Sequence, residues 1–185
     1  MQVSNEIQKA LITIHEMMKD RGIKFDNLLS DNVNNHEPIF HYSHSSQKEK
    51  MHVVFFLNGK GWKEVAGYLE DNDLELADYY LIVVNDPTHL KKNKDALENF
   101  QTFTLEELQF NISTHELTPK HELITNEVEI NHIMNLYQLK TKTQMPQIVK
   151  TDPMSRYFNA KAGQMMKVTR ISPTCGESIV YRCVV

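Results

Sequence analysis

The chain has 185 residues, of which 41% are hydrophobic and 24% charged, and a formal net charge of -4. A chain of this length can bury roughly 70% of its unfolded surface, enough for one core or two small domains, so disorder of the whole chain is excluded. Its apolar runs, such as residues 53–57, are far shorter than the about 20 residues that cross a bilayer, and its first residues lack a signal-peptide pattern. We therefore expect a soluble protein with no membrane partner, and the net charge argues against binding nucleic acid over the whole surface.

The charge is distributed unevenly along the chain. From Lys150 onward six basic residues face two acidic ones, a balance of +4, whereas the preceding part has 14 basic and 22 acidic residues, a balance of -8. A basic C-terminal segment on an acidic body indicates a docking surface for an acidic partner.

The first fifty residues contain one clear helix and a polar segment. Apolar residues at helical spacing, between a cap at Ser4 and a stop at Gly22, predict a helix over residues 5–21. Residues 26–29 could begin a second short helix. The segment 30–50 is rich in Asn, Ser and His and predicts a loop with one short strand around residues 39–42.

Two apolar segments that are rich in β-branched and aromatic residues follow. They predict buried strands at 51–57 and 80–84, with helices at 62–70 and 90–97 after them. A strand, a crossover helix and a second strand predict a βαβ unit with parallel pairing.

The C-terminal third changes pattern. Thr125 is the expected N-cap of a helix whose buried stripe is Ile130, Ile133, Met134 and Tyr137. Asp152 and Pro153 predict the start of a short helix through Phe158. After a turn at 161–163, two strands at 165–171 and 178–185 are joined by a Pro/Gly-containing turn, which predicts a β-hairpin.

The sequence offers little for catalysis. His115-Glu116-Leu117 begins like the zinc-protease helix motif, but Pro119 stands where the second His is required and would break the helix. The residues His36, His41, His44 and His52 lack regular ligand spacing, so we interpret them as solvated loop histidines. Cys175 and Cys183 have no Cys/His framework around them and are expected to be reduced thiols, with a disulfide as the lesser alternative. No catalytic residue, metal site or cofactor is predicted.

Three lysines, Lys91, Lys92 and Lys94, follow a turn at a predicted helix start. They could contact phosphates without sequence specificity, or they could form a solvated helix face beside Asp95 and Glu98. The residues alone leave both interpretations open.

Four stretches near the C-terminus carry a family resemblance. They are Asn-Ile-Ser-Thr-His-Glu-Leu-Thr-Pro-Lys-His at 111–121, Thr-Asp-Pro-Met-Ser-Arg-Tyr-Phe at 151–158, the segment 163–176, and Tyr-Arg-Cys-Val-Val at 181–185. Together they resemble the fifth subunit shared by the eukaryotic nuclear DNA-directed RNA polymerases, a family that includes a shorter archaeal form. The residues before them resemble the eukaryotic form more loosely, through the Val-Val-Phe-Phe and Leu-Ile-Val-Val strands and an Asp-Pro-Thr turn. A shortfall between residues 29 and 52 and the Asn-rich composition favour the version of a large DNA virus.

The resemblance implies an α+β / α/β fold in two domains. Residues 1–110 would form an α/β jaw domain with a small mixed sheet, and residues 111–185 an α+β assembly domain with a β-hairpin. The protein would be a non-catalytic polymerase subunit that docks on the largest subunit, beside neighbouring subunits, and contacts downstream duplex DNA weakly and non-specifically. It would lie in the nucleus if cellular, or in the virion or host-cell cytoplasm if viral.

The resemblance also assigns residues to each contact. The DNA loop, where Asp-Pro-Thr-His replaces the family's usual Thr-Pro-Ser-Ala, would use Thr88, His89, Lys91, Lys92 and Lys94. The partner interface would use His115, Pro119, His121, Asp152, Pro153, Arg156, Tyr157, Lys167, Arg170, Tyr181 and Arg182. In this interpretation Arg156, Lys167, Arg170 and Arg182 form one basic surface, and the short helix presents Arg156 and Tyr157. The alternatives are a free-standing nuclease-like protein that processes DNA, and an adaptor that uses the same C-terminal fold outside the polymerase.

Overall fold

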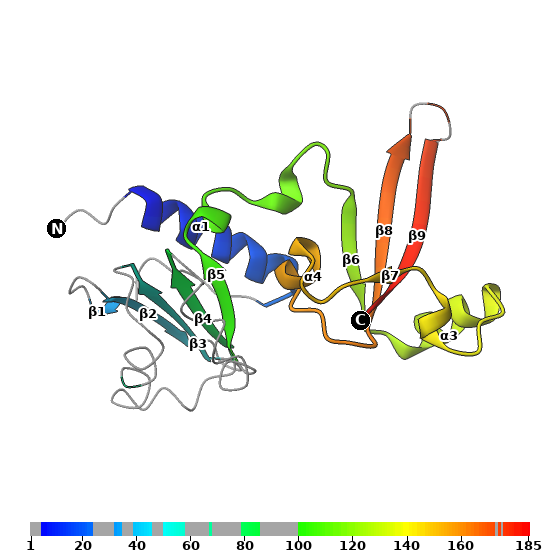
Figure 1. Cartoon of the computed structure of the whole chain (residues 1–185), viewed down its shortest axis with the longest axis horizontal. Helices are drawn as coiled ribbons and strands as arrows, with labels where there is room; N and C mark the ends of the chain where they lie inside the picture. Colours follow the sequence, from blue (N-terminus) through cyan, green and yellow to red (C-terminus); the bar gives the residue numbers. More distant parts are fainter. Residues whose placement is uncertain are drawn as a thin grey trace. The chain divides into compact units, whose positions relative to one another are not determined.

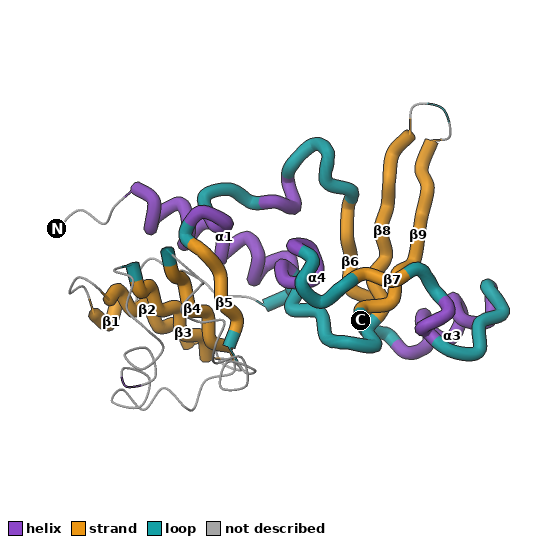
Figure 2. Tube along the Cα trace, viewed as in Figure 1, coloured by secondary structure: helices purple, strands orange, loops and turns teal. Residues whose placement is uncertain are grey.

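The computed structural model describes residues 5–23, 32–34, 39–45, 50–57, 67, 79–85, 100–172, 174 and 176–185. The chain folds as two compact units, residues 1–110 and 111–185. The first contains a five-stranded sheet and the second a four-stranded sheet, labelled in Figure 1 and shown as orange tubes in Figure 2. The protein is therefore of the mixed α/β type that the sequence predicts.

The first unit begins with helix α1 (Asn5–Asp20), close to the predicted range. Its apolar stripe is buried, including Met17 and Met18, so these methionines belong to the core. Gly22, two residues past the end of the helix, has a φ of +81° that suits glycine, and the amide of Ile23 donates to the carbonyl of Met18 at 3.0 Å. This Schellman-type ending satisfies carbonyls that the last turn leaves unpaired.

The sheet of the first unit has the order β1-β2-β3-β4-β5. Its strands are β1 (Asn32–Asn34), β2 (Ile39–Ser45), β3 (Lys50–Phe56), β4 (Tyr79–Val84) and β5 (Gln101–Thr104). Strands β3 and β4 pair in parallel, as do β4 and β5, which confirms the predicted parallel arrangement. The helices expected at 62–70 and 90–97, and a short helix at 26–29, fall outside the described residues, apart from Gly67, which is helical.

Two features of this sheet differ from the prediction. The segment 30–50 was expected to be a loop with one short strand, yet it contributes β1, all of β2 and the first residue of β3. The reason is that β2 pairs antiparallel with β3 over its full length, and such pairing satisfies backbone groups whatever the polarity of the side chains. Strand β5 was also missed, because its four residues are too few for a recognisable period.

Long-range hydrogen bonds close the first unit. The guanidinium of Arg21, at the end of α1, donates to Oε1 of Gln101 on β5 at 2.7 Å. After β5, the short 3-10 helix η5 (Glu106–Leu108) is followed by Gln109, whose side-chain amide donates to the carbonyl of Glu6 at 3.1 Å. Both ends of α1 are thereby tied to the last segment of the unit.

The sheet of the second unit has the order β6-β8-β9-β7. Its strands are β6 (Lys120–Ile124), β7 (Gln147–Ile148), β8 (Met165–Ser172) and β9 (Gly176–Val184). Strands β8 and β9 form the predicted antiparallel hairpin, β6 pairs antiparallel with β8, and the two residues of β7 pair in parallel with β9. The hairpin extends well past the ends of β6 and β7 (Figure 1).

Each face of this sheet has its own apolar cluster. Helix α3 (Glu127–Leu136) contributes to the first, which consists of Ile124, Ile130, Ile133, Met145, Met165 and Cys183. The second lies beside the short helix α4 (Pro153–Tyr157) and consists of Ile148, Ala160, Met166, Val168 and Val184. Met165 and Met166 are fully buried in different clusters, so the sheet is covered on both sides near its base.

The helix caps correct one prediction and confirm another. The N-cap of α3 is Asn126, whose side chain accepts from the amide of Val128 at 2.9 Å, and not Thr125. Both residue types favour this position, so sequence spacing alone could not separate neighbours. Tyr137 was expected in the buried stripe, but it is the C-cap and is 52% exposed. In α4, Asp152 is the N-cap and Pro153 the first helical residue, as predicted.

Cys183 is a buried free thiol, in agreement with the expectation of reduced cysteines, whereas Cys175 lies outside the described residues. Among the helices in the described ranges, none is long and apolar enough to cross a membrane.

The cap of α4 provides a test of the fold. Oδ1 of Asp152 accepts from the amide of Met154 at 2.9 Å, so Asp152→Ala should lower the free energy of unfolding by about 0.5–2 kcal/mol. Asp152→Asn keeps an acceptor and should stay close to the wild type. Urea unfolding followed by circular dichroism at pH 8 measures both, and equal stability of the Ala variant and the wild type would contradict the capping role.

Candidate partner interface

The strand register decides which charged residues share a face of the second sheet. Side chains alternate between faces along a strand, and directly paired residues point to the same side. His121 pairs with Val168, Arg182 with Met166, and Arg170 follows Val168 by two residues. His121, Arg170 and Arg182 therefore lie on one side of the sheet, which we call the basic face.

His121 is the half-buried member of the basic face. Its Nδ1 donates to the carbonyl of Pro119 at 2.7 Å. The pKa of His121 is lowered from its ordinary value, chiefly by burial and further by the charges of Arg182 and Arg170, while the Pro119 hydrogen bond and Asp152 act in the opposite direction. The structure thus brings these five predicted interface residues into one electrostatic neighbourhood, with a neutral imidazole near pH 7.

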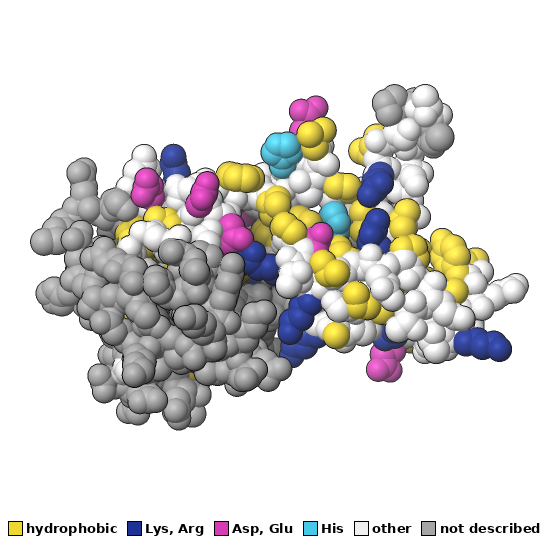
Figure 3. All heavy atoms as spheres, in the orientation of Figure 1, with side chains coloured by type: hydrophobic (Ala, Val, Ile, Leu, Met, Phe, Trp, Pro, Cys, Tyr) yellow, Lys and Arg dark blue, Asp and Glu magenta, His cyan; other side chains and the backbone are white. Residues whose placement is uncertain are grey.

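The two arginines differ in how accessible they are. Arg182 is half-buried, and its Nη1 donates to the carbonyl of Gln147 at 3.0 Å, at the junction of β9 and β7. Arg170 is exposed on the part of β8 that extends beyond its pairing with β6. Lys and Arg side chains, drawn dark blue, are visible over the β8–β9 hairpin in Figure 3. Arg170 is therefore the member of the basic face best placed to meet an acidic group.

The positions of Lys167 and Tyr181 differ from the expectation of a single basic surface. They pair with each other and occupy positions of opposite parity to Arg170 and Arg182, so they lie on the other face of the sheet. The ring of Tyr181 packs edge-on against Tyr137, with centroids 6.0 Å apart. The expected surface of four basic residues is thus divided by the two-residue period of the strands.

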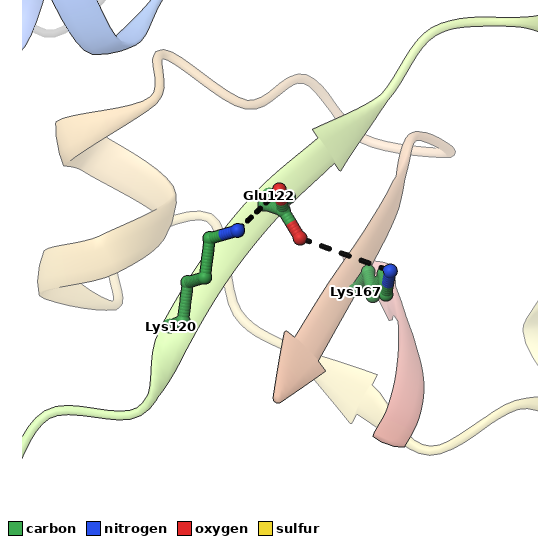
Figure 4. Close-up of polar contacts among 3 residues, drawn as sticks. All are labelled: Lys120, Glu122 and Lys167. Carbon is green, nitrogen blue, oxygen red and sulfur yellow. Dashed lines mark ion pairs between the residues drawn. The ribbon is translucent and has the colours of Figure 1, made fainter. Parts of the chain in front are cut away.

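Lys167 shares a small ion-pair cluster with two residues of β6. Glu122 Oε1 lies 2.9 Å from Lys120 Nζ, and Glu122 Oε2 lies 3.8 Å from Lys167 Nζ (Figure 4). The pKa of Glu122 is lowered, chiefly by its hydrogen bond from Lys120; burial acts in the opposite direction, and the charges of Lys120 and Lys167 lower the pKa further. These side chains are substantially exposed, so the cluster adds little to stability, but it compensates the charge of Lys167.

Tyr157 corrects a second expectation. It is only 4% exposed, its ring packs against Phe158 with centroids 5.2 Å apart, and its hydroxyl lies 3.3 Å from that of Ser113. Tyr157 therefore anchors α4 inside its own domain and is not presented to a partner. Of its neighbours, Arg156 is half-buried and Pro153 is exposed in the first turn.

The segment before β6 has local structural roles. Asn111 is buried, and its Oδ1 accepts from both the amide (2.9 Å) and the hydroxyl (2.7 Å) of Ser113, which caps the 3-10 helix η6 (Ile112–Thr114). This role was missed, although Asn is a known turn residue because its side chain can accept from the backbone two residues further on. His115 is exposed, and its Nδ1 accepts from the amide of Leu117 at 3.2 Å, a contact within its own turn.

Two exposed hydrophobic residues of the hairpin were also missed. Ile171 is 88% exposed and Ile179 is 40% exposed. Side chains alternate between the two faces along both strands, and the strands extend past the length that α3 can cover. This pattern is the signal that could have revealed the two residues.

The predicted DNA-contacting residues Thr88, His89, Lys91, Lys92 and Lys94 lie outside the described residues, so that contact stays a prediction. Within the described part of the chain, no group of three or more His, Cys, Asp or Glu residues could hold a metal ion.

The second unit is thus a small α/β domain with two apolar clusters and a charged sheet face, a type suited to protein association. Residues 110–184 match the family model of the RNA polymerase Rpb5 C-terminal domain. The DNA-directed RNA polymerase subunit Rpo5 of Thermofilum pendens is 42% identical over 76 residues, which cover 41% of this chain and 92% of that protein.

Eukaryotic relatives match the same part of the chain. The subunit RPABC1 of DNA-directed RNA polymerases I, II and III from Caenorhabditis briggsae is 44% identical over 79 residues, 43% of this chain and 36% of that protein. The corresponding subunit of Dictyostelium discoideum is 37% identical over 92 residues, 50% of this chain and 44% of that protein. The chain thus matches less than half the length of these longer relatives. It belongs to the family of RNA polymerase fifth subunits, Rpb5 and Rpo5, as the sequence resemblance indicated.

The lowered pKa of His121 predicts a pH dependence of stability. Below about pH 6.5 the unfolded chain binds a proton that the folded imidazole resists, so stability should fall as the pH drops from about 6.5 towards the lower folded pKa. His121→Asn should flatten this slope, and an NMR titration should place the His121 midpoint below 6.5. His132→Asn, which removes an exposed imidazole from α3, is the matched control. A midpoint of His121 at or above 6.5 would contradict the assignment.

Proposed function

We propose that the protein is a non-catalytic subunit of a multisubunit DNA-dependent RNA polymerase, and that residues 112–185 dock on the largest subunit. One observation carries this proposal: the matched domain makes up 92% of an archaeal protein that is itself named a polymerase subunit. The same segment of this chain folds as a unit with its own sheet and two apolar clusters. A domain that can constitute nearly a whole subunit supports the same role here.

The charge of the basic face supports docking against an acidic surface. Arg170 is exposed, and within the described residues no carboxylate forms an ion pair with it. Lys167, in contrast, has an ion pair with Glu122. Guanidinium groups pair readily with carboxylates of a partner and contribute mainly specificity and association rate. The active site and its metal ions would belong to the large subunits, so this chain needs no cofactor.

The proposal for residues 1–110 is more indirect, since it comes from the family resemblance. We propose that this unit is a jaw beside downstream duplex DNA, with Lys91, Lys92 and Lys94 contacting phosphates. Such contacts would be weak and carry no base specificity.

The alternatives receive less support. A metal-dependent nuclease needs clustered carboxylates, yet β3 and β4 contain none, and the described residues offer no three-ligand cluster. An adaptor outside the polymerase is disfavoured by relatives that are named as polymerase subunits. The location proposed for a cellular protein is the nucleus, and for a viral one the virion or host-cell cytoplasm.

The docking proposal predicts a loss of assembly on charge reversal. Arg170→Glu should reduce co-purification of the chain with the largest polymerase subunit by about tenfold, since it replaces an attractive contact by a repulsive one. Lys120→Glu makes the same charge change at an exposed position on the other face and should assemble normally. Affinity purification with quantitative mass spectrometry measures both. If the wild-type chain recovered no large subunit, the proposed function would fail.

The jaw proposal predicts a change in salt dependence. The triple variant Lys91→Ala, Lys92→Ala, Lys94→Ala should lower the affinity of the assembled enzyme for downstream duplex. The slope of log K against log salt should become shallower by about 0.9 for each phosphate that the variant no longer neutralises. A variant with Lys9, Lys19 and Lys140 changed to Ala, all exposed, controls for net charge. An unchanged slope would assign the three lysines to a solvated helix face.

A further inference from the structure

The outer edge of β9 is unpaired over most of its length. Strand β9 has nine residues, and β7 pairs only with Cys183 and Val184, which leaves Gly176 to Arg182 without a neighbouring strand on that side in the described part of the chain. Strand β7 cannot extend further, because Pro146 precedes it and proline has no N–H to continue a ladder. The hairpin therefore presents a seven-residue strand edge.

The hydrogen bonds at the base of β9 show which of its amides point outward. The amides of Cys183 and Val185 donate to the carbonyls of Pro146 and Ile148, on the β7 side, both at 2.9 Å. The amide of Val184 donates instead to Gln164, on the β8 side, at 2.9 Å. Because this alternation continues along the strand, Glu177, Ile179 and Tyr181 direct their backbone groups outward.

The centre of this edge lacks the features that usually keep strand edges from pairing. Natural edges are shortened, bulged, or carry charged residues, especially lysine, or proline. Gly176 to Arg182 contains neither lysine nor proline; its two charged residues, Glu177 and Arg182, stand near its ends, and its centre is the uncharged run Ile179-Val180-Tyr181. The opposite edge strand, β6, has only five residues and carries the exposed Lys120–Glu122 ion pair. Strand β9 is thus the less protected of the two edges.

We propose that the outer edge of β9 pairs with an extended segment of the largest polymerase subunit. This segment would form an additional strand on the same side of β9 as β7. This inference rests on the proposed function, since it names how that partner is bound. Backbone hydrogen bonds to Glu177, Ile179 and Tyr181 hold the segment, the mode known as β-augmentation. Its side chains alternate: those beside Ile179 and Tyr181 are apolar, and those beside Arg182, on the basic face, are acidic.

A proline scan tests the backbone contact without removing the hairpin. Ile179→Pro deletes an outward amide, and proline is tolerated at strand edges whose N–H does not serve the ladder. The variant should fold, as judged by circular dichroism, but co-purify with the largest subunit about tenfold less or worse, because it loses a hydrogen bond and obstructs the added strand. Ile179→Ala keeps the amide and loses the side chain, so it should be recovered better than the proline variant.

A second pair of variants separates the effect of the backbone edge from the effect of the Ile179 side chain. Glu177→Pro deletes another outward amide at an exposed position, and Glu177→Gln is its matched control. Should Ile179→Pro fail to fold, Glu177→Pro alone decides, with the loss of co-purification expected for the proline and not for the glutamine. Hydrogen exchange should show the 176–182 segment more protected in the polymerase than in the free chain.

The outcomes distinguish this inference from the proposed function. If folded proline variants assemble as well as their controls while Arg170→Glu does not, the added strand is excluded and docking through the basic face stands. If the wild-type chain recovers no large subunit, the proposed function itself fails. Loss of assembly by both proline variants, with both controls retained, establishes pairing at β9.

Discussion

The antiparallel register between β8 and β9 is the constraint on which the C-terminal domain depends. It pairs Met165 with Cys183 and Met166 with Arg182, and so directs one methionine into each apolar cluster. The same register places Arg170 on one face and Lys167 on the other. Core and charged surface are thus set by a single alignment, because the side-chain period of a strand is two.

Along the β8–β9 hairpin, the residues that stabilise the fold lie near the base, and the residues exposed for contact with a partner lie near the tip. Near the base both faces are covered, by α3 on one side and by the segment around α4 on the other. Towards the tip neither face is covered, and exposure rises to 88% at Ile171. Substitutions near the tip can therefore affect a partner while costing the fold little.

The sequence predicted those elements of the fold whose signal extends over a long segment or lies in a few neighbouring residues. The helix α1 followed from helical periodicity, the buried strands β3 and β4 from their β-branched and aromatic content, the β8–β9 hairpin from its Pro/Gly-containing turn, and the Asp152-Pro153 start of α4 from capping chemistry. Short strands such as β7 could not be found, since they exist only through pairing with distant residues. The division of the expected basic surface, and the burial of Tyr157, depend on register and packing that spacing alone does not reveal.

The two-residue period also limits how this domain can change in evolution. Replacing one residue of β8 or β9 alters a single position on a single face. Inserting or deleting one residue within either strand would exchange the faces of every residue beyond it, turning the charged Arg182 towards the apolar cluster that contains Met165, and Cys183 towards the opposite face. Lineages should therefore vary these strands by substitution, and accept changes of length in the connection between β6 and β7 or at the hairpin turn.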